Sequence, residues 1–122
     1  MRRRLFGLIL TIGALLTPVS LSGHHGAATF ETSVELTLKG TVTDWAWFNP
    51  HCILRFDVKD EKDTVTNWAV EGGNPTDMTR RGWSRTSFRP GHDITVTLQQ
   101  AKSGAPVGRI RTVVLADGRK MP

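Results

Sequence analysis

The sequence predicts an all-β domain with one short helix, folded as a small five-stranded barrel of the OB type. Three observations support this fold class. Five segments alternate between apolar and polar residues, a helix-start signal lies between the third and fourth segments, and the whole set fits within residues 34–118. An open β-sandwich built from the same strands is the alternative, because element order does not distinguish the two folds.

The first strand is predicted to begin at Val34, where a strict apolar-polar alternation starts. Its inward side carries Val34, Leu36, Leu38 and Val42. Gly40 occupies an inward position in the middle of this strand, which indicates a bulge or a sharp coil of the sheet. Strong coiling favours a small barrel.

The second strand follows a break at Asn49-Pro50. Its inward residues are Cys52, Leu54, Phe56 and Val58. On that parity His51 faces away from the core. A charged turn at residues 60–63 leads to a third strand, Val65–Glu71, whose inward residues include Trp68 and Val70.

A short helix is predicted after Gly72-Gly73. Asn74 is its cap, Pro75 takes the first position, and Asp77 adds an acid in the first turn. The helix should end near Arg81, because Gly82 is a typical stop residue.

The fourth strand carries Ile94, Val96 and Leu98 inward, and the fifth covers Arg109–Leu115. The segment Gly104–Gly108 links them as a hairpin loop. Arg109 and Arg111 alternate on one face of the fifth strand, and we interpret that face as a solvated edge.

Residues 1–22 have the composition of a cleaved export signal. Arginines at positions 2–4 precede an apolar run, Leu5–Leu16, and Ser20-Leu21-Ser22 provides a small-residue cleavage site. The run is too short to span a bilayer, so we expect general secretion, a periplasmic or secreted protein, and no membrane anchor after cleavage. Residues 23–33 then form an N-terminal arm, pinned to the surface by Phe30, and residues 34–118 form the barrel domain.

Removal of the signal changes the charge of the chain. The 16 Lys and Arg residues include the three signal arginines, which leaves 13 against 11 Asp and Glu, a net charge of about +2 in place of +5. With export predicted as well, we expect no nucleic-acid partner. Cys52 is the only cysteine, which excludes an internal disulfide and favours burial as a small hydrophobic residue.

Two of the four histidines lie next to the predicted cleavage site. Cutting after Ser22 exposes Gly23-His24-His25, whose amine, two backbone amides and third-residue imidazole form a square-planar nitrogen set suited to Cu(II) or Ni(II). Cutting one residue later makes His24 the terminus, so that its amine and ring chelate copper together with a second histidine. Both arrangements stay open, because sequence fixes the cleavage position only loosely.

A second candidate site lies in the barrel itself. In an OB barrel the end of the first strand meets the start of the second, the end of the third and the start of the fourth. The residues expected to share that end are Trp45, Trp47, Asn49, His51, Glu71 and His92. Imidazole, carboxylate and indole groups gathered at one end predict a pocket for a metal or a small ligand. The helix that includes Met78 is expected to flank this pocket. The arm is long enough to reach this pocket. His51 and the His24-His25 pair therefore form either one shared metal site or two separate sites.

Five motifs give the chain a family resemblance. They are the His24-His25 pair after the signal, Trp47–His51, Trp68–Gly73, Arg80–Trp83 and Arg89–Gly91. With these motifs the sequence resembles a family of small exported bacterial proteins whose domain has no known function. The resemblance covers nearly all of the processed chain and implies no activity or catalytic residue. The family usually has Ala before the His pair and Ser after it, where this chain has Gly23 and Gly26.

Two functional hypotheses follow, and neither is enzymatic. The sequence lacks a nucleophile elbow, an HExxH motif and a phosphate-binding glycine loop, so we expect no catalysis. The first hypothesis is an exported copper-binding protein that uses Gly23, His24, His25 and His51. The second is a non-catalytic accessory module whose Trp/His end binds a small molecule or another exported protein. Core packing of the tryptophans and a hydrogen-bonded turn histidine at position 51 are the purely structural alternatives.

Overall fold

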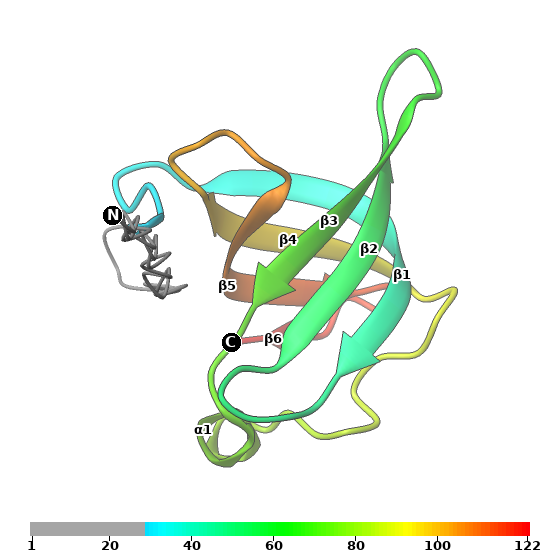
Figure 1. Cartoon of the computed structure of the whole chain (residues 1–122). Coiled ribbons are helices and arrows are strands. Elements are labelled where there is room, and N and C mark those ends of the chain that lie inside the picture. Colours follow the sequence, from blue (N-terminus) through cyan, green and yellow to red (C-terminus); the bar gives the residue numbers. More distant parts are fainter. Residues whose placement is uncertain (1–28) are drawn as a thin grey trace, which may run out of the picture.

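The computed structural model describes residues 29–122, which form one closed β-barrel with a short helix at its end (Figure 1). The elements follow the order β1 (Leu36–Ala46), β2 (Ile53–Lys59), β3 (Val65–Glu71), α1 (Pro75–Arg80), β4 (Asp93–Gln100), β5 (Val107–Leu115) and β6 (Lys120–Met121). No helix in this part of the chain is long and apolar enough to cross a membrane.

Strand pairing closes the barrel. β1 pairs antiparallel with both β2 and β4, and the pairs β2–β3 and β4–β5 are also antiparallel. The ring is completed by a short parallel ladder that joins Ala69–Glu71 to Val107–Arg109. The cyclic order β1-β2-β3-β5-β4, with a helix between β3 and β4, confirms the predicted OB-like barrel. Because β3 and β5 pair, the open β-sandwich is excluded.

The local predictions for β3 and α1 are confirmed. β3 spans Val65–Glu71, as expected from its alternation. Asn74 caps α1, since its side-chain oxygen accepts a hydrogen bond of 2.9 Å from the Asp77 amide. The helix ends at Arg80, and Gly82 follows with a φ of 87°, a conformation that glycine adopts without strain.

β1 departs from the predicted alternation in two places. Val34 precedes the strand and is 62% exposed, so it is not a core residue. The bulge lies between Val42 and Asp44, not at Gly40. It shifts the side-chain parity by one residue, because the extra residue has no partner on β2.

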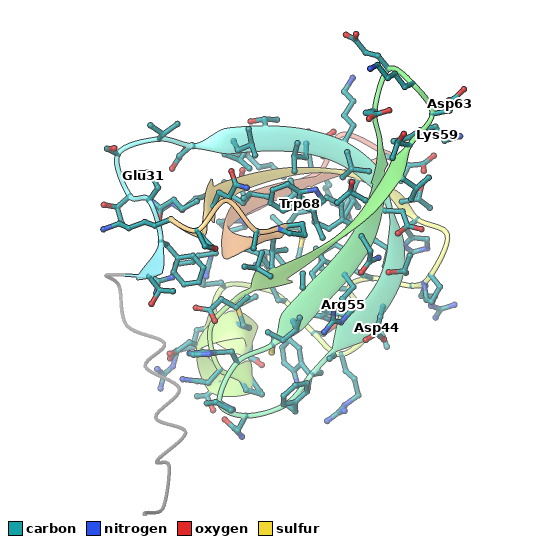
Figure 2. The ribbon with its side chains drawn as sticks, turned by 45° about the horizontal axis from the view of Figure 1, so that its top comes forward. Glu31, Asp44, Arg55, Lys59, Asp63 and Trp68 are labelled. Carbon is teal, nitrogen blue, oxygen red and sulfur yellow. The ribbon has the colours of Figure 1, made fainter. Side chains whose placement is uncertain are left out.

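The bulge decides which side chains enter the barrel. Beyond it Trp45 pairs with the buried Leu54 and joins the inward side, while Asp44 pairs with Arg55 on the outer side. Figure 2 shows Asp44 and Arg55 beside each other on neighbouring strands. Without this shift the indole of Trp45 would point into solvent.

Gly40 marks a close approach of two backbones. A β-carbon at this position would clash with the Asp57 carbonyl oxygen on β2 and would lie 2.8 Å from Cδ2 of Phe56. The inward glycine therefore lets β1 coil closely over β2, which confirms the sharp coil that the sequence indicated.

Both ends of the described chain are attached to the barrel. Phe30 is 5% exposed and forms an isolated antiparallel bridge with Ala101, so the arm is pinned as expected. Figure 1 shows this segment (cyan) beside the loop between β4 and β5 (orange). At the other end β6 pairs with β5, and the Trp83 indole donates a 2.8 Å hydrogen bond to the Pro122 carbonyl. The fold thus continues past residue 118, where we expected it to end.

One apolar core fills the barrel and continues beneath α1. It consists of Val42, Cys52, Leu54, Phe56, Trp68, Val70, Met78, Trp83, Phe88, Ile94, Val96, Leu98, Ile110 and Val113. Met78 is the only residue of α1 that is buried, and it closes the end of the barrel where β1 and β3 finish.

We predict that Gly40→Ala lowers the free energy of unfolding by about 1–3 kcal/mol, because the added methyl group overpacks the β1–β2 contact. Chemical denaturation of the two proteins measures the difference. Gly73→Ala is the matched control, since a β-carbon there meets only ordinary contacts of 3.5 Å or more. Equal stability of the Gly40 variant and the wild type would show that β1 and β2 do not need this close approach.

Candidate functional site

Four of the predicted site residues lie at one end of the barrel. Ala46 pairs with Ile53, and Ile53 pairs with Glu71, so the end of β1, the start of β2 and the end of β3 are level with one another. His51 precedes β2 and lies at this end. Trp45 and Trp47 lie at the same end but occupy the inward side of β1 and the loop that follows it.

A charged cluster of His51, Glu71 and Arg109 forms the outer part of this end, and we call it the Glu71 cluster. One carboxylate oxygen of Glu71 lies 3.5 Å from Nδ1 of His51, and the other lies 3.7 Å from Nη2 of Arg109. The Glu71 side chain is only 13% exposed, whereas His51 and Arg109 are 37% and 33% exposed. The carboxylate is therefore the sheltered centre of the cluster, and the imidazole is its accessible edge.

The Glu71 cluster borders a groove of about 530 Å³. Its walls come from the loop before β2, the Gly72–Asn74 segment before α1, and the first half of β5. Arg81, Arg109 and Arg111 add positive charge to the groove, and Glu71 and Asp77 add negative charge. A groove of this size with both signs of charge suits a small polar ligand or a metal ion with its own ligands.

The N-terminal arm is anchored directly against the Glu71 cluster. The guanidinium carbon of Arg109 lies 4.9 Å from the centroid of the Phe30 ring, a cation–π distance. The Glu31 amide donates to the Gln100 carbonyl at 2.8 Å, and the Lys102 amide donates to the Thr29 carbonyl at 3.0 Å. Figure 2 shows Glu31 on this segment, away from the β2–β3 hairpin that carries Lys59 and Asp63.

The tryptophans pack into the barrel end and do not line the groove. Trp45 contacts three aromatic rings at centroid distances of 5.8 Å (Trp47), 5.9 Å (Trp83) and 5.1 Å (Phe88). Its indole nitrogen also donates a 2.9 Å hydrogen bond to the Ser84 carbonyl. These contacts fit a packing role, with tilted and edge-to-face geometry.

His92 does not join the Glu71 cluster. It is exposed in the turn before β4, on a different groove shared with Arg89 and Arg119. The start of β4 pairs with Leu115, at the end of β5, whereas Glu71 pairs with Arg109 near the start of β5. Six residues of strand separate these two positions, about 20 Å. The stagger of the strands in a closed barrel thus corrects the expectation that His92 shares this end.

The remaining predicted residues divide into two groups. Asn49 is exposed and precedes Pro50 across a cis peptide bond, at the rim of the barrel end. Gly23, His24 and His25 lie outside the described residues, as does the predicted signal at positions 1–22. Within residues 29–122 no three His, Cys, Asp or Glu side chains are grouped closely enough to hold a metal ion.

Sequence reasoning missed the role of Arg109. We interpreted Arg109 and Arg111 as a solvated edge, and only Arg111 fits that description, with half of its side chain exposed and an ion pair to Glu35 at 3.2 Å. Arg109 is two-thirds buried between Phe30 and Glu71. The parallel register of β3 with β5 creates this environment, and nothing in the local sequence around Arg109 specifies that register.

Cys52 is part of the core and not of the groove. Its side chain has no solvent exposure, and its backbone exchanges hydrogen bonds with Gly72 and Gly73 at 2.8 and 2.9 Å. Burial raises the pKa of the Cys52 thiol, which keeps it protonated and unreactive. The burial predicted from the sequence is confirmed.

Fold and site together define a small OB-like barrel with a charged His-Glu-Arg cluster at the point where its N-terminal arm is anchored. The chain matches the model of DUF6152, a family of unknown function, over residues 14–110, and it belongs to that family. The family resemblance expected from the five motifs is therefore confirmed at the level of the family. A search of the curated proteins found no match.

We predict that a thiol reagent modifies Cys52 in the native protein at least about 100-fold more slowly than in denaturant, because the reaction must wait for local opening of the barrel. The measurement is the labelling rate with a chromogenic disulfide, with free glutathione as the reference thiol. A native rate close to that of glutathione would mean that the start of β2 opens readily.

Proposed function

We propose that this protein is an exported copper-binding protein whose Cu(II) site combines its processed N-terminus, His24 or His25, and the imidazole of His51. One observation carries the proposal. The arm is anchored by Phe30 against Arg109, and Arg109 pairs with the same carboxylate that faces His51. The anchor thus brings the arm to the one described histidine that lies beside a sheltered carboxylate.

Chain length supports a shared site. From Phe30 back to His25 is five residues, and back to His24 is six, which span at most about 17 Å and 20 Å when extended. The anchor is separated from His51 only by the side chains of Arg109 and Glu71, which contact each other at 3.7 Å. A histidine of the arm is therefore within reach of the His51 ring.

The surroundings of the His51 ring also support its role as a metal ligand. Its Nδ1 faces Glu71 at 3.5 Å, which leaves Nε2 for a metal ion. Histidine ligands commonly direct their second nitrogen to a carboxylate, which orients the ring and raises its basicity. An amine, backbone amides and imidazoles are the nitrogen donors that Cu(II) prefers.

The proposal assigns the protein to the periplasm or the extracellular space, in keeping with the predicted cleaved signal. It assigns no catalytic role, no nucleic-acid partner and no membrane anchor after cleavage. Copper is the only cofactor proposed, and in this role the metal is a bound ion held by the arm and the barrel together.

A second candidate function is supported by the groove beside His51. Its volume of about 530 Å³ suits a small polar molecule or a segment of another exported protein, as a non-catalytic accessory module would require. Of the residues first considered for this role, His51 and Glu71 line the groove. The copper experiments below separate the two candidates, because a groove ligand does not need a free N-terminus.

We predict that the natively processed protein binds one Cu(II) ion tightly, and that four extra alanines at the processed terminus weaken binding by at least about 10-fold. The extension moves His24 and His25 beyond the third position, so that the new terminal amine and the backbone amides next to it have no imidazole to complete the chelate. Isothermal titration gives affinity and stoichiometry, and intact mass fixes the cleavage site beforehand. Unchanged affinity in the extended protein would rule out the terminal chelate.

The contribution of His51 is tested by His51→Ala, with His92→Ala as the matched control on the far groove. We expect the first substitution to weaken Cu(II) binding by about 10–100-fold and the second to leave it unchanged. Electron paramagnetic resonance should show one coupled nitrogen fewer in the His51 variant. If the two variants bind copper equally well, all ligands belong to the arm and the shared site is wrong.

A further inference from the structure

Arg109 lies where the arm, β3 and β5 meet in the described part of the chain. Its guanidinium lies over the Phe30 ring at 4.9 Å and beside the Glu71 carboxylate at 3.7 Å. Its backbone is paired with Glu71 on one side and with Gln99 on the other, within the ladder that closes the barrel. The side chain therefore extends from a fixed point, and its two contacts are made from a rigid strand.

The main-chain contacts of the arm do not connect it to the Glu71 cluster, and the described connection is made through Arg109. The hydrogen bonds of Glu31 and Lys102, together with the Phe30–Ala101 bridge, attach the arm to the end of β4 and to the loop that follows it. None of these contacts involves β3 or the Glu71 cluster. The ring of Phe30 is the part of the arm that contacts Arg109, so stacking on the guanidinium is the described contact that ties the arm to the carboxylate facing His51.

We propose that Arg109 is a positioning residue that couples the docking of the N-terminal arm to the orientation of His51. Its planar face holds Phe30, and its Nη2 holds the Glu71 carboxylate in the place where the other oxygen faces Nδ1 of His51. Through these two contacts the arm and the imidazole are fixed relative to each other before a metal ion arrives. This inference rests on the proposed copper site and assigns the residue that preorganises it.

A simpler role for Arg109 would be neutralisation of Glu71, and charge alone would then suffice. Lysine keeps the positive charge but lacks the planar guanidinium that stacks on an aromatic face and faces a carboxylate at the same time. Glutamine removes the charge as well. The pair Arg109→Lys and Arg109→Gln therefore separates stacking from neutralisation.

Arg119 provides the control, because it borders the separate groove of His92 and Arg89. Its guanidinium pairs with Asp117 at 3.2 Å and has no described contact with Phe30 or Glu71. Arg119→Lys and Arg119→Gln thus change the same residue type without touching the arm anchor or the groove beside His51. Chemical denaturation of all four variants verifies that each one folds.

The experiment is Cu(II) titration of the natively processed wild type and the four variants, with electron paramagnetic resonance of each copper complex. Hydrogen exchange of the Glu31 amide in the metal-free proteins reports arm docking separately. We expect Arg109→Lys to weaken copper binding by about two- to five-fold through lost stacking, and Arg109→Gln by about 10-fold or more, with one coupled nitrogen lost. Glu31 exchange should accelerate in both, and the Arg119 variants should match the wild type.

The outcomes separate this inference from the copper site itself. A wild type that binds no stoichiometric copper overturns the proposed function, and the coupling by Arg109 fails with it. If the wild type binds copper and the Arg109 and Arg119 variants behave alike, Arg109 is not a positioning residue. Faster Glu31 exchange with unchanged copper affinity also overturns the coupling, because Arg109 would then only anchor the arm.

Discussion

The parallel pairing of Ala69–Glu71 with Val107–Arg109 is the constraint on which the rest of the structure depends. These few residues convert a meander of antiparallel strands into a closed ring, and closure removes the two long free edges that an open sheet would expose. Gly108 of this ladder also lies close against β4, where a β-carbon would lie 2.7 Å from the Gln99 carbonyl oxygen. The same register brings a carboxylate and a guanidinium from distant parts of the chain next to each other.

The bulge in β1 determines that Trp45 lies on the inward side of the barrel end. By moving Trp45 inward it adds the indole to an aromatic group with Trp83 and Phe88, which fills the end of the core. The outer side is left to polar groups. The aromatic group comes from β1 and from the segment between α1 and β4, whereas Glu71 and Arg109 of the charged cluster come from β3 and β5.

Much of the fold was predictable because each signal was local. The alternation of β3 and the Asn74-Pro75 start of α1 depend on neighbours in the sequence, and both appear as expected. The site was only partly predictable. His51 and Glu71 flank two strands that run next to each other along the chain, so their proximity followed from a simple hairpin. The contact of Arg109 with both Phe30 and Glu71 depends on a pairing between strands far apart in sequence.

By itself the sequence determined the class of fold, the elements and the burial of Cys52, because periodicity and capping act over a few residues. Only the tertiary structure decided which groups share the site. The strand stagger of the closed barrel separates His92 from His51 by most of the length of β5, and the β3–β5 register turns Arg109 from an edge residue into the link between arm and carboxylate. Stagger and register are properties of the closed ring as a whole, and no single segment encodes them.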